Sequence, residues 1–118
     1  MNKSCTVYKT ASFIGKRWTL IILHELYKGR GKRRYSDLKK RLPGITPKIL
    51  SARLKELGRE ALVKKSIDTS AVPVKCEYSL TPCGLEFTRI VRDMKTWALR
   101  WKIKNRECEK TDCLNCWR

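Results

Sequence analysis

The sequence predicts a mainly α-helical fold with one small β-hairpin, in the α+β class. Three observations predict it: apolar residues spaced three and four apart, two Thr-Pro pairs typical of helix starts, and two adjacent β-prone runs. The 118 residues, 42% of them apolar, suffice for one core. We expect one domain over residues 1–107, followed by a Cys-rich tail at residues 108–118.

Three helices are expected in the first part of the chain. A short one covers residues 7–14, and a second covers residues 16–27 on an apolar stripe that only Glu25 interrupts. Ser36 is the candidate N-cap of a third, short helix, which should stop at Pro43. These helices would build the first half of the core.

A fourth helix should begin at Thr46, because Thr is a favoured N-cap and the following Pro47 suits the first helical turn. Its apolar positions step by four, three and four residues and predict one buried stripe: Leu50, Leu54, Leu57 and Ala61. The residues that point outward are small or cationic.

A hairpin is expected after that helix. The β-prone runs are residues 62–67 and 74–80, and residues 68–73 join them. In the second run alternate positions are apolar, which predicts one buried face: Val74, Cys76, Tyr78 and Leu80.

The last helix should be long. Thr81 and Pro82 repeat the start pattern, and the helix extends to about Lys104, farther than one small domain can cover. An apolar seam on it suits a partner helix and predicts a homodimer, with these interface residues: Phe87, Ile90, Met94, Trp97 and Trp101.

This order of elements is that of a winged helix-turn-helix with a long C-terminal dimerisation helix. The major groove of B-DNA admits one helix, which a second helix braces across the backbone. The fourth helix is therefore the candidate reader of bases, through Thr46, Lys48, Ser51, Ala52, Arg53 and Lys55. The alternative is that these are ordinary solvated helix residues.

The charge favours a polyanionic partner. The net charge is +17, and residues 28–65 hold 14 Lys or Arg and 3 Asp or Glu, which leaves +11 in that stretch. Double-stranded DNA is the expected partner. Candidate phosphate contacts are Arg33, Arg34, Lys39, Lys40 and Arg41, and candidate wing contacts are Lys64, Lys65 and Lys75. A solvated cationic face is the alternative.

Other classes of protein find less support. No apolar run approaches the roughly 20 residues of a spanning helix, and the first residues lack the apolar region of a secretory signal, so we expect a cytoplasmic protein without a membrane partner. No catalytic motif occurs, and His24, within an apolar helix, is expected to be structural. A sequence-tolerant architectural or RNA-binding protein and a redox or metal electron carrier remain as alternatives.

Several segments together carry a family resemblance: Cys5, residues 14–23, 35–38, 42–57 and 77–81, and Gly84. With them, residues 5–101 resemble the HxlR-type transcriptional regulators, relatives of the MarR-like winged-helix group. The usual Gly-Gly-Lys-Trp appears here as Gly-Lys-Arg-Trp at residues 15–18. The resemblance implies a symmetric dimer on palindromic operators, paired through the terminal helices, with the Thr46 helix in the major groove and the hairpin as wing.

The cysteines leave questions open. The resemblance implies a thiol sensor at Cys5, and an inert thiol is the alternative. The tail spacing Cys-x4-Cys-x2-Cys suits zinc or an iron–sulfur cluster held by Cys108, Cys113 and Cys116, with Cys5 as a fourth ligand brought close in a dimer. Disulfide chemistry, or no role, are the other interpretations. Cys76 and Cys83 are expected to be small core residues.

Overall fold

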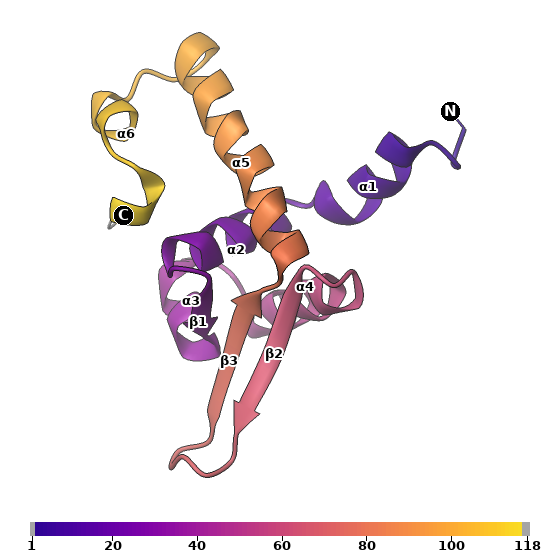
Figure 1. Cartoon of the computed structure of the whole chain (residues 1–118), viewed down its shortest axis with the longest axis vertical. Helices are drawn as coiled ribbons and strands as arrows, with labels where there is room; N and C mark the ends of the chain where they lie inside the picture. Colours follow the sequence, from indigo (N-terminus) through magenta and orange to yellow (C-terminus); the bar gives the residue numbers. More distant parts are fainter. Residues whose placement is uncertain (1, 117–118) are drawn as a thin grey trace.

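The computed structural model describes residues 2–116 and is mainly helical, with a small antiparallel sheet (Figure 1). The elements are, in chain order, α1 (Thr6–Ile14), α2 (Arg17–Lys28), β1 (Lys32–Arg34), α3 (Tyr35–Arg41), α4 (Pro47–Arg59), β2 (Val63–Asp68), β3 (Lys75–Leu80), α5 (Pro82–Trp101), α6 (Arg106–Lys110) and the 3₁₀ turn η1 (Cys113–Asn115). The predicted winged helix-turn-helix is confirmed.

The sheet has three strands where the sequence predicts two. Its order is β1-β3-β2, and Tyr78 at its centre pairs with Arg33 on one side and Lys65 on the other. β1 consists of three cationic residues and shows no apolar alternation, so its own pattern does not mark it as a strand. β1 is a strand because it pairs with β3. The expectation of a bare hairpin is corrected in this respect.

The core lies where α2 meets α3, α4 and the sheet. Each of these elements contributes apolar side chains at the spacing of its own period, and α2 supplies three that are fully buried. The main members are Ile22, Leu23, Leu26, Leu38, Leu42, Ile45, Leu50, Leu54, Leu57, Leu62, Val63 and Tyr78. One contiguous core therefore holds the two helices of the DNA-binding motif.

The buried stripe of α4 is shorter than predicted. Leu50, Leu54 and Leu57 are buried, but Ala61 lies beyond the helix, is exposed and has a φ of 62°. Val74 is likewise exposed, because β3 begins only at Lys75. α3 begins at Tyr35, and Ser36 is not its cap. These boundaries correct the predictions by one or a few residues.

Both Thr-Pro starts are confirmed. Thr46 Oγ1 accepts a hydrogen bond from the Ile49 amide at 3.2 Å, and Thr81 Oγ1 accepts one from the Gly84 amide at 3.0 Å. The Thr81 hydroxyl also donates to the Ala61 carbonyl at 2.6 Å. Thr81 thus caps α5 and holds Ala61, the left-handed residue that follows the end of α4.

We expect Thr81→Ala to lower the free energy of unfolding by about 2 kcal/mol, the upper end for a lost cap, since it removes both bonds. Thr46→Ala removes only the cap and should cost about 1 kcal/mol. Urea denaturation of both variants measures the difference. Equal losses would show that the bond to Ala61 contributes nothing.

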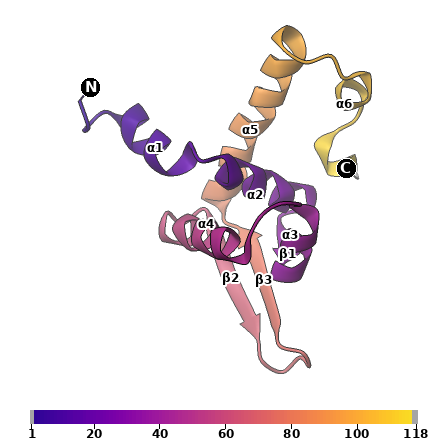
Figure 2. The ribbon, with the colours of Figure 1, turned by 180° about the vertical axis from the view of Figure 1, so that it is seen from behind.

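α5 leaves the domain and the chain then turns back. The helix ends at Trp101 rather than near Lys104 and projects away from the wing (Figure 1). After α6 the chain reaches α2 again with η1, and both α6 and η1 lie on the side of the molecule opposite α1 (Figure 2). Within residues 2–116 no helix has both the length and the apolar character that a membrane crossing requires.

Candidate nucleic-acid interface

The N-terminal half of α4 presents a free surface. Its apolar stripe faces the core, and the residues between those positions are exposed: Thr46, Lys48, Ser51, Ala52 and Lys55. No acidic side chain interrupts this face before Glu56. Helix positions of this kind provide donors, acceptors and a methyl group of a size that reaches base edges.

Arg53, the sixth predicted reader, is turned away from that face. Its guanidinium donates to Glu56 at 2.8 Å, and only 22% of its side chain is exposed. Lys16, just before α2, pairs with the same carboxylate at 3.0 Å. Arg53 is therefore paired within its own helix, and Lys16 joins the same carboxylate to the segment before α2. Base reading by Arg53 stays a prediction.

Glu25, the single break in the apolar stripe of α2, is buried and gathers cations around it. Arg41 Nε donates to its carboxylate at 2.7 Å, Lys28 lies at 3.4 Å and Arg33 at 3.6 Å, and Arg33 Nε also donates to the Glu25 carbonyl at 2.7 Å. Burial, with the nearby Arg41, lowers the pKa of Arg33. We call these four residues the Glu25 cluster.

The Glu25 cluster contains two of the predicted phosphate contacts, and their role in DNA binding stays a prediction. Arg33 in β1 and Arg41 in α3 hold these elements against α2, and their side chains are 14% and 30% exposed. The remaining predicted phosphate contacts are exposed on α3 or just before it: Arg34, Lys39 and Lys40. These three, with the outward face of α4, are what the helix-turn-helix offers to a polyanion.

The β2–β3 hairpin projects from the domain beside α4 (Figure 1). Lys64 and Lys65 are exposed on β2, whereas Lys75 is half-buried and lies 3.9 Å from Glu77. A groove between α4 and the hairpin is lined by Ser51, Lys55 and Lys65 among others. Candidate base-reading and wing residues therefore share one concave surface.

Comparison with known proteins bears on this surface. The family model for the HxlR-like helix-turn-helix matches residues 13–106. The chain belongs to the HxlR family. One relative is an uncharacterized HTH-type transcriptional regulator, YvaP of Bacillus subtilis (strain 168), which is 36% identical over 93 residues that span 79% of this chain and 83% of YvaP. This HxlR protein is a DNA-binding transcriptional regulator.

Solved structures agree with that assignment. A transcriptional regulator assigned to the MarR family from Porphyromonas gingivalis W83 superimposes with a TM-score of 0.75 at 31% identity, covering 86% of this chain and 96% of that one. The oxidised form of the redox regulator HypR gives a TM-score of 0.74 at 32% identity, covering 84% and 99%. The MarR-like winged-helix architecture is thus shared with these proteins.

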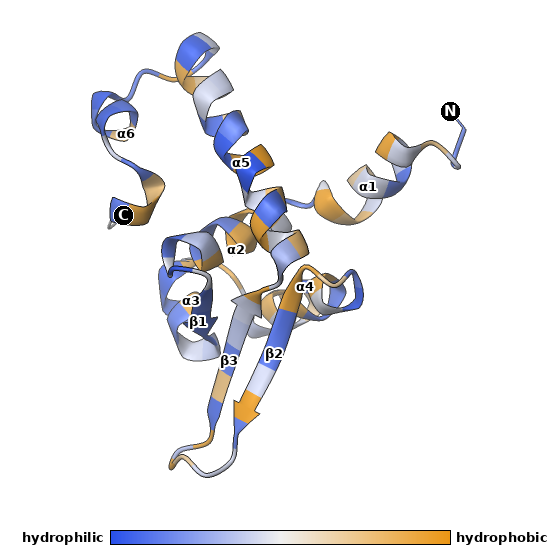
Figure 3. Ribbon diagram, in the orientation of Figure 1, coloured by the Kyte–Doolittle hydropathy of each residue, from blue (hydrophilic) through white to orange (hydrophobic). Residues whose placement is uncertain are grey.

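The apolar seam of the HxlR protein lies open along α5. Ile90, Met94, Trp97 and Trp101 are 53%, 48%, 57% and 69% exposed, and apolar residues recur along this helix (Figure 3). Phe87, in contrast, packs against the core of its own chain. The predicted seam therefore begins at Ile90. Exposed apolar stripes of this length usually mark an interface.

The six cysteines lie before α1, in β3, at the start of α5 and in the tail. Cys5 is half-buried just before α1, on the side of the molecule opposite the tail (Figures 1 and 2). Within one chain Cys5 therefore cannot complete a site with the tail cysteines. Cys76 is half-buried in β3 and packs against the core, as expected, but Cys83 is exposed at the start of α5, which corrects its assignment to the core.

The tail cysteines line a cavity of about 560 Å³ that closes against α2. Cys108 and Cys116 are half-buried, and Cys113 is buried. His24 lies in the wall contributed by α2, where burial and the nearby Lys28 lower the pKa of its imidazole. The sequence analysis missed this link, because 84 residues or more separate His24 from the tail.

Proposed function

We propose that the protein is a sequence-specific regulator that binds a palindromic operator in double-stranded DNA as a homodimer. The observation that carries this proposal is the free face of α4, where Lys48, Ser51 and Ala52 are exposed beside a cationic hairpin. In a helix-turn-helix this part of the second helix meets the base edges. The proposal assigns base reading to α4 and phosphate contacts to Arg34, Lys39 and Lys40.

The homodimer is supported by the exposed seam on α5, which the single chain leaves uncovered from Ile90 to Trp101. A two-fold dimer pairs the same surface of both protomers and presents two copies of α4. Two half-sites one helical turn of DNA apart, or a multiple of that turn, would then be read together.

Thiol sensing at Cys5 stays a prediction of the family resemblance. The structural similarity to the redox regulator HypR supports it, as does the half-buried position of Cys5 just before α1. Binding-site selection with reduced and with oxidised protein tests the operator and the sensing function in one experiment.

Selection from randomised duplexes at physiological salt tests the sequence-specific interpretation. Specific binders usually exceed their own nonspecific binding by about 10³-fold or more. We expect selected palindromic duplexes to reach that ratio over unselected ones. A ratio below about tenfold would instead favour the sequence-tolerant binder that the net charge of +17 also suits.

Lys48→Ala should relax base preference at one position of each half-site, with a loss of about 1–3 kcal/mol on the selected duplex and little loss on random DNA. Arg34→Ala is the matched control, because a lost phosphate contact should weaken every duplex alike and reduce the salt slope by about 1. Fluorescence anisotropy on both duplexes over a salt series measures both effects. Identical behaviour of the two variants would contradict base reading by α4.

A further inference from the structure

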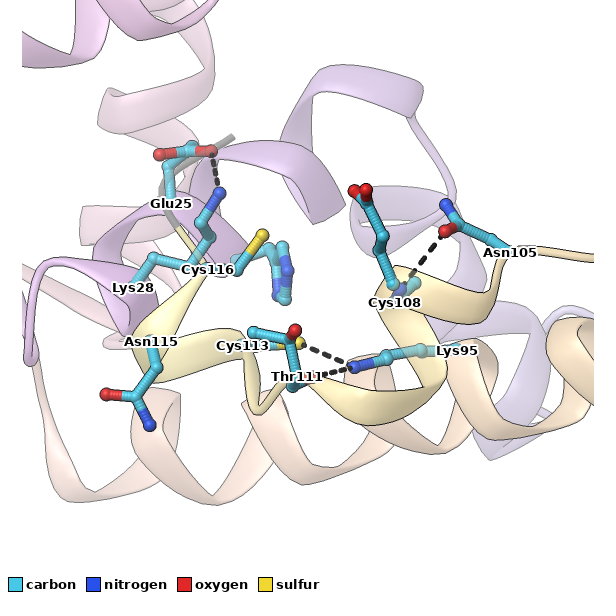
Figure 4. Close-up of a pocket in the computed structure, with 11 residues that line it drawn as sticks. Glu25, Lys28, Lys95, Asn105, Cys108, Thr111, Cys113, Asn115 and Cys116 are labelled. Carbon is cyan, nitrogen blue, oxygen red and sulfur yellow. Dashed lines mark hydrogen bonds and ion pairs between the residues drawn. The ribbon is translucent and has the colours of Figure 1, made fainter.

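The cavity beneath the tail gathers soft ligands away from the DNA-binding face. Cys108 of α6 and Cys113 and Cys116 at the two ends of η1 line it (Figure 4). His24 lines it from α2. Three thiols and one imidazole are a donor set typical of structural zinc sites. The question is whether the local fold directs these donors toward one point.

The backbone of the tail brings two of the thiols onto one side. η1 is a 3₁₀ turn, in which residues three apart eclipse one another, and Cys113 and Cys116 are three apart. The turn is closed by hydrogen bonds from the Asn115 amide to Asp112 at 2.9 Å and from the Cys116 amide to Cys113 at 3.2 Å. The turn therefore keeps Cys113 at its start and Cys116 just after its end, both in the lining of the cavity.

The third thiol is positioned by a cap. Asn105 accepts a hydrogen bond from the Cys108 amide at 3.0 Å through its side chain, which starts α6 at the rim of the cavity (Figure 4). Lys95 of α5 then joins the tail to the body of the protein, since its ammonium donates to the Thr111 carbonyl at 2.9 Å.

His24 supplies an independent observation. Its Nδ1 atom is buried and has no hydrogen-bond partner among the described residues. A buried polar atom without a partner calls for an explanation, and an unoccupied ion site is one.

The charges around the cavity suit a bound anionic centre. Zinc with three thiolates and one imidazole carries a net charge of −1. Lys95 Nζ lies 3.6 Å from Cys113 Sγ, and Lys28 lines the same cavity while pairing with Glu25 at 3.4 Å. Lys95 therefore stands where it would offset that charge, whereas Lys28 is paired with Glu25 and the lining also contains Glu107.

We propose that this cavity binds one Zn²⁺ through Cys108, Cys113, Cys116 and His24. Across residues 2–116 no three His, Cys, Asp or Glu side chains are already close enough to hold a metal ion, so binding must bring the three thiols and the imidazole closer together within the cavity. Each thiol releases its proton to solvent as its sulfur binds, three protons for each zinc ion. The imidazole favours zinc over an iron–sulfur cluster, which is usually held by four thiolates.

Titration of the full-length, reduced and chelator-treated protein with Zn²⁺, and separately with Co²⁺, tests the proposal. We expect one ion per chain, a tetrahedral cobalt spectrum with thiolate-to-metal charge transfer, and slower hydrogen exchange in residues 106–116 once zinc is bound. His24→Gln and Cys116→Ser should each weaken zinc binding by more than about 100-fold, since even loss of an outer-shell partner costs 10–100-fold. Cys83→Ser, which removes an exposed thiol outside the cavity, should bind zinc like the parent protein.

Three results would overturn the proposal. The first is zinc uptake by the parent protein that is no higher than zinc uptake by Cys116→Ser. The second is an unchanged cobalt spectrum in His24→Gln, which would remove His24 from the site. The third is a protein that assembles an iron–sulfur cluster and does not take up zinc. Far-ultraviolet circular dichroism of each zinc-free variant shows whether the fold is intact, and Cys116→Ser, at the end of the tail, tests the site without disturbing α2.

Discussion

Trp97→Glu is expected to convert the proposed homodimer to a monomer in sedimentation equilibrium. Trp97 is 57% exposed at the middle of the seam, between Met94 and Trp101. Buried Trp residues are common hot spots, each contributing about 2 kcal/mol or more to association. A two-fold dimer loses this contact twice and places two carboxylates in an apolar interface. The dissociation constant should therefore rise at least about 1,000-fold, as about 4 kcal/mol requires.

Binding to the palindromic operator should fall with dimerisation, because a monomer engages only one half-site. Thr96→Glu is the matched control: it adds the same charge to the same helix at an exposed residue about 100° around α5 from Trp97. That variant should stay dimeric and bind DNA. A dimeric Trp97→Glu protein would show that the subunits pair through another surface, and monomeric Thr96→Glu would show that any added charge on α5 suffices.

Local patterns in the sequence predict most of the elements. α2, α4 and α5 are amphipathic over three turns or more, and Thr46 and Thr81 cap their helices through bonds within four residues. Such features depend on near neighbours only, so the sequence carries them directly. The hairpin is found for the same reason.

β1 and the tail depend on distant partners instead. β1 is a strand because Arg33 pairs with Tyr78, 45 residues away. η1 lies against α2, and Lys95 of α5 holds the tail through its bond to Thr111, between α6 and η1. β1 has three residues and α6 has five, too few for a periodic pattern in the sequence to reveal these contacts.

The candidate site likewise contains some residues that local patterns in the sequence identify and others that only the fold identifies. The sequence identifies which residues of α4 point outward, because a helix fixes the direction of each side chain. It does not separate Arg34, which is exposed, from Arg33 and Arg41, which are held by Glu25 from eight and 16 residues away. Only the fold shows which cations are already paired.

Glu25→Ala should accordingly be the most destabilising single substitution among those considered. The Glu25 carboxylate is buried, and its removal leaves Arg41, Arg33 and Lys28 close together without their shared counter-ion. Removing one partner of a buried ion pair costs about 3–5 kcal/mol. The free energy of unfolding of a small domain is only about 5–15 kcal/mol. Urea denaturation should therefore show that the variant has lost a large part of its stability.

Glu60→Ala is the control, since Glu60 is exposed at the end of α4 and its removal should change stability by no more than about 0.5 kcal/mol. A double-mutant cycle with Arg41→Ala isolates the pair, and coupling of about 0.5–3 kcal/mol is expected for groups in direct contact. A loss below about 1 kcal/mol in Glu25→Ala would mean that water or a rearranged side chain replaces the carboxylate. α3 would then be held against α2 by Leu38 and its apolar neighbours alone.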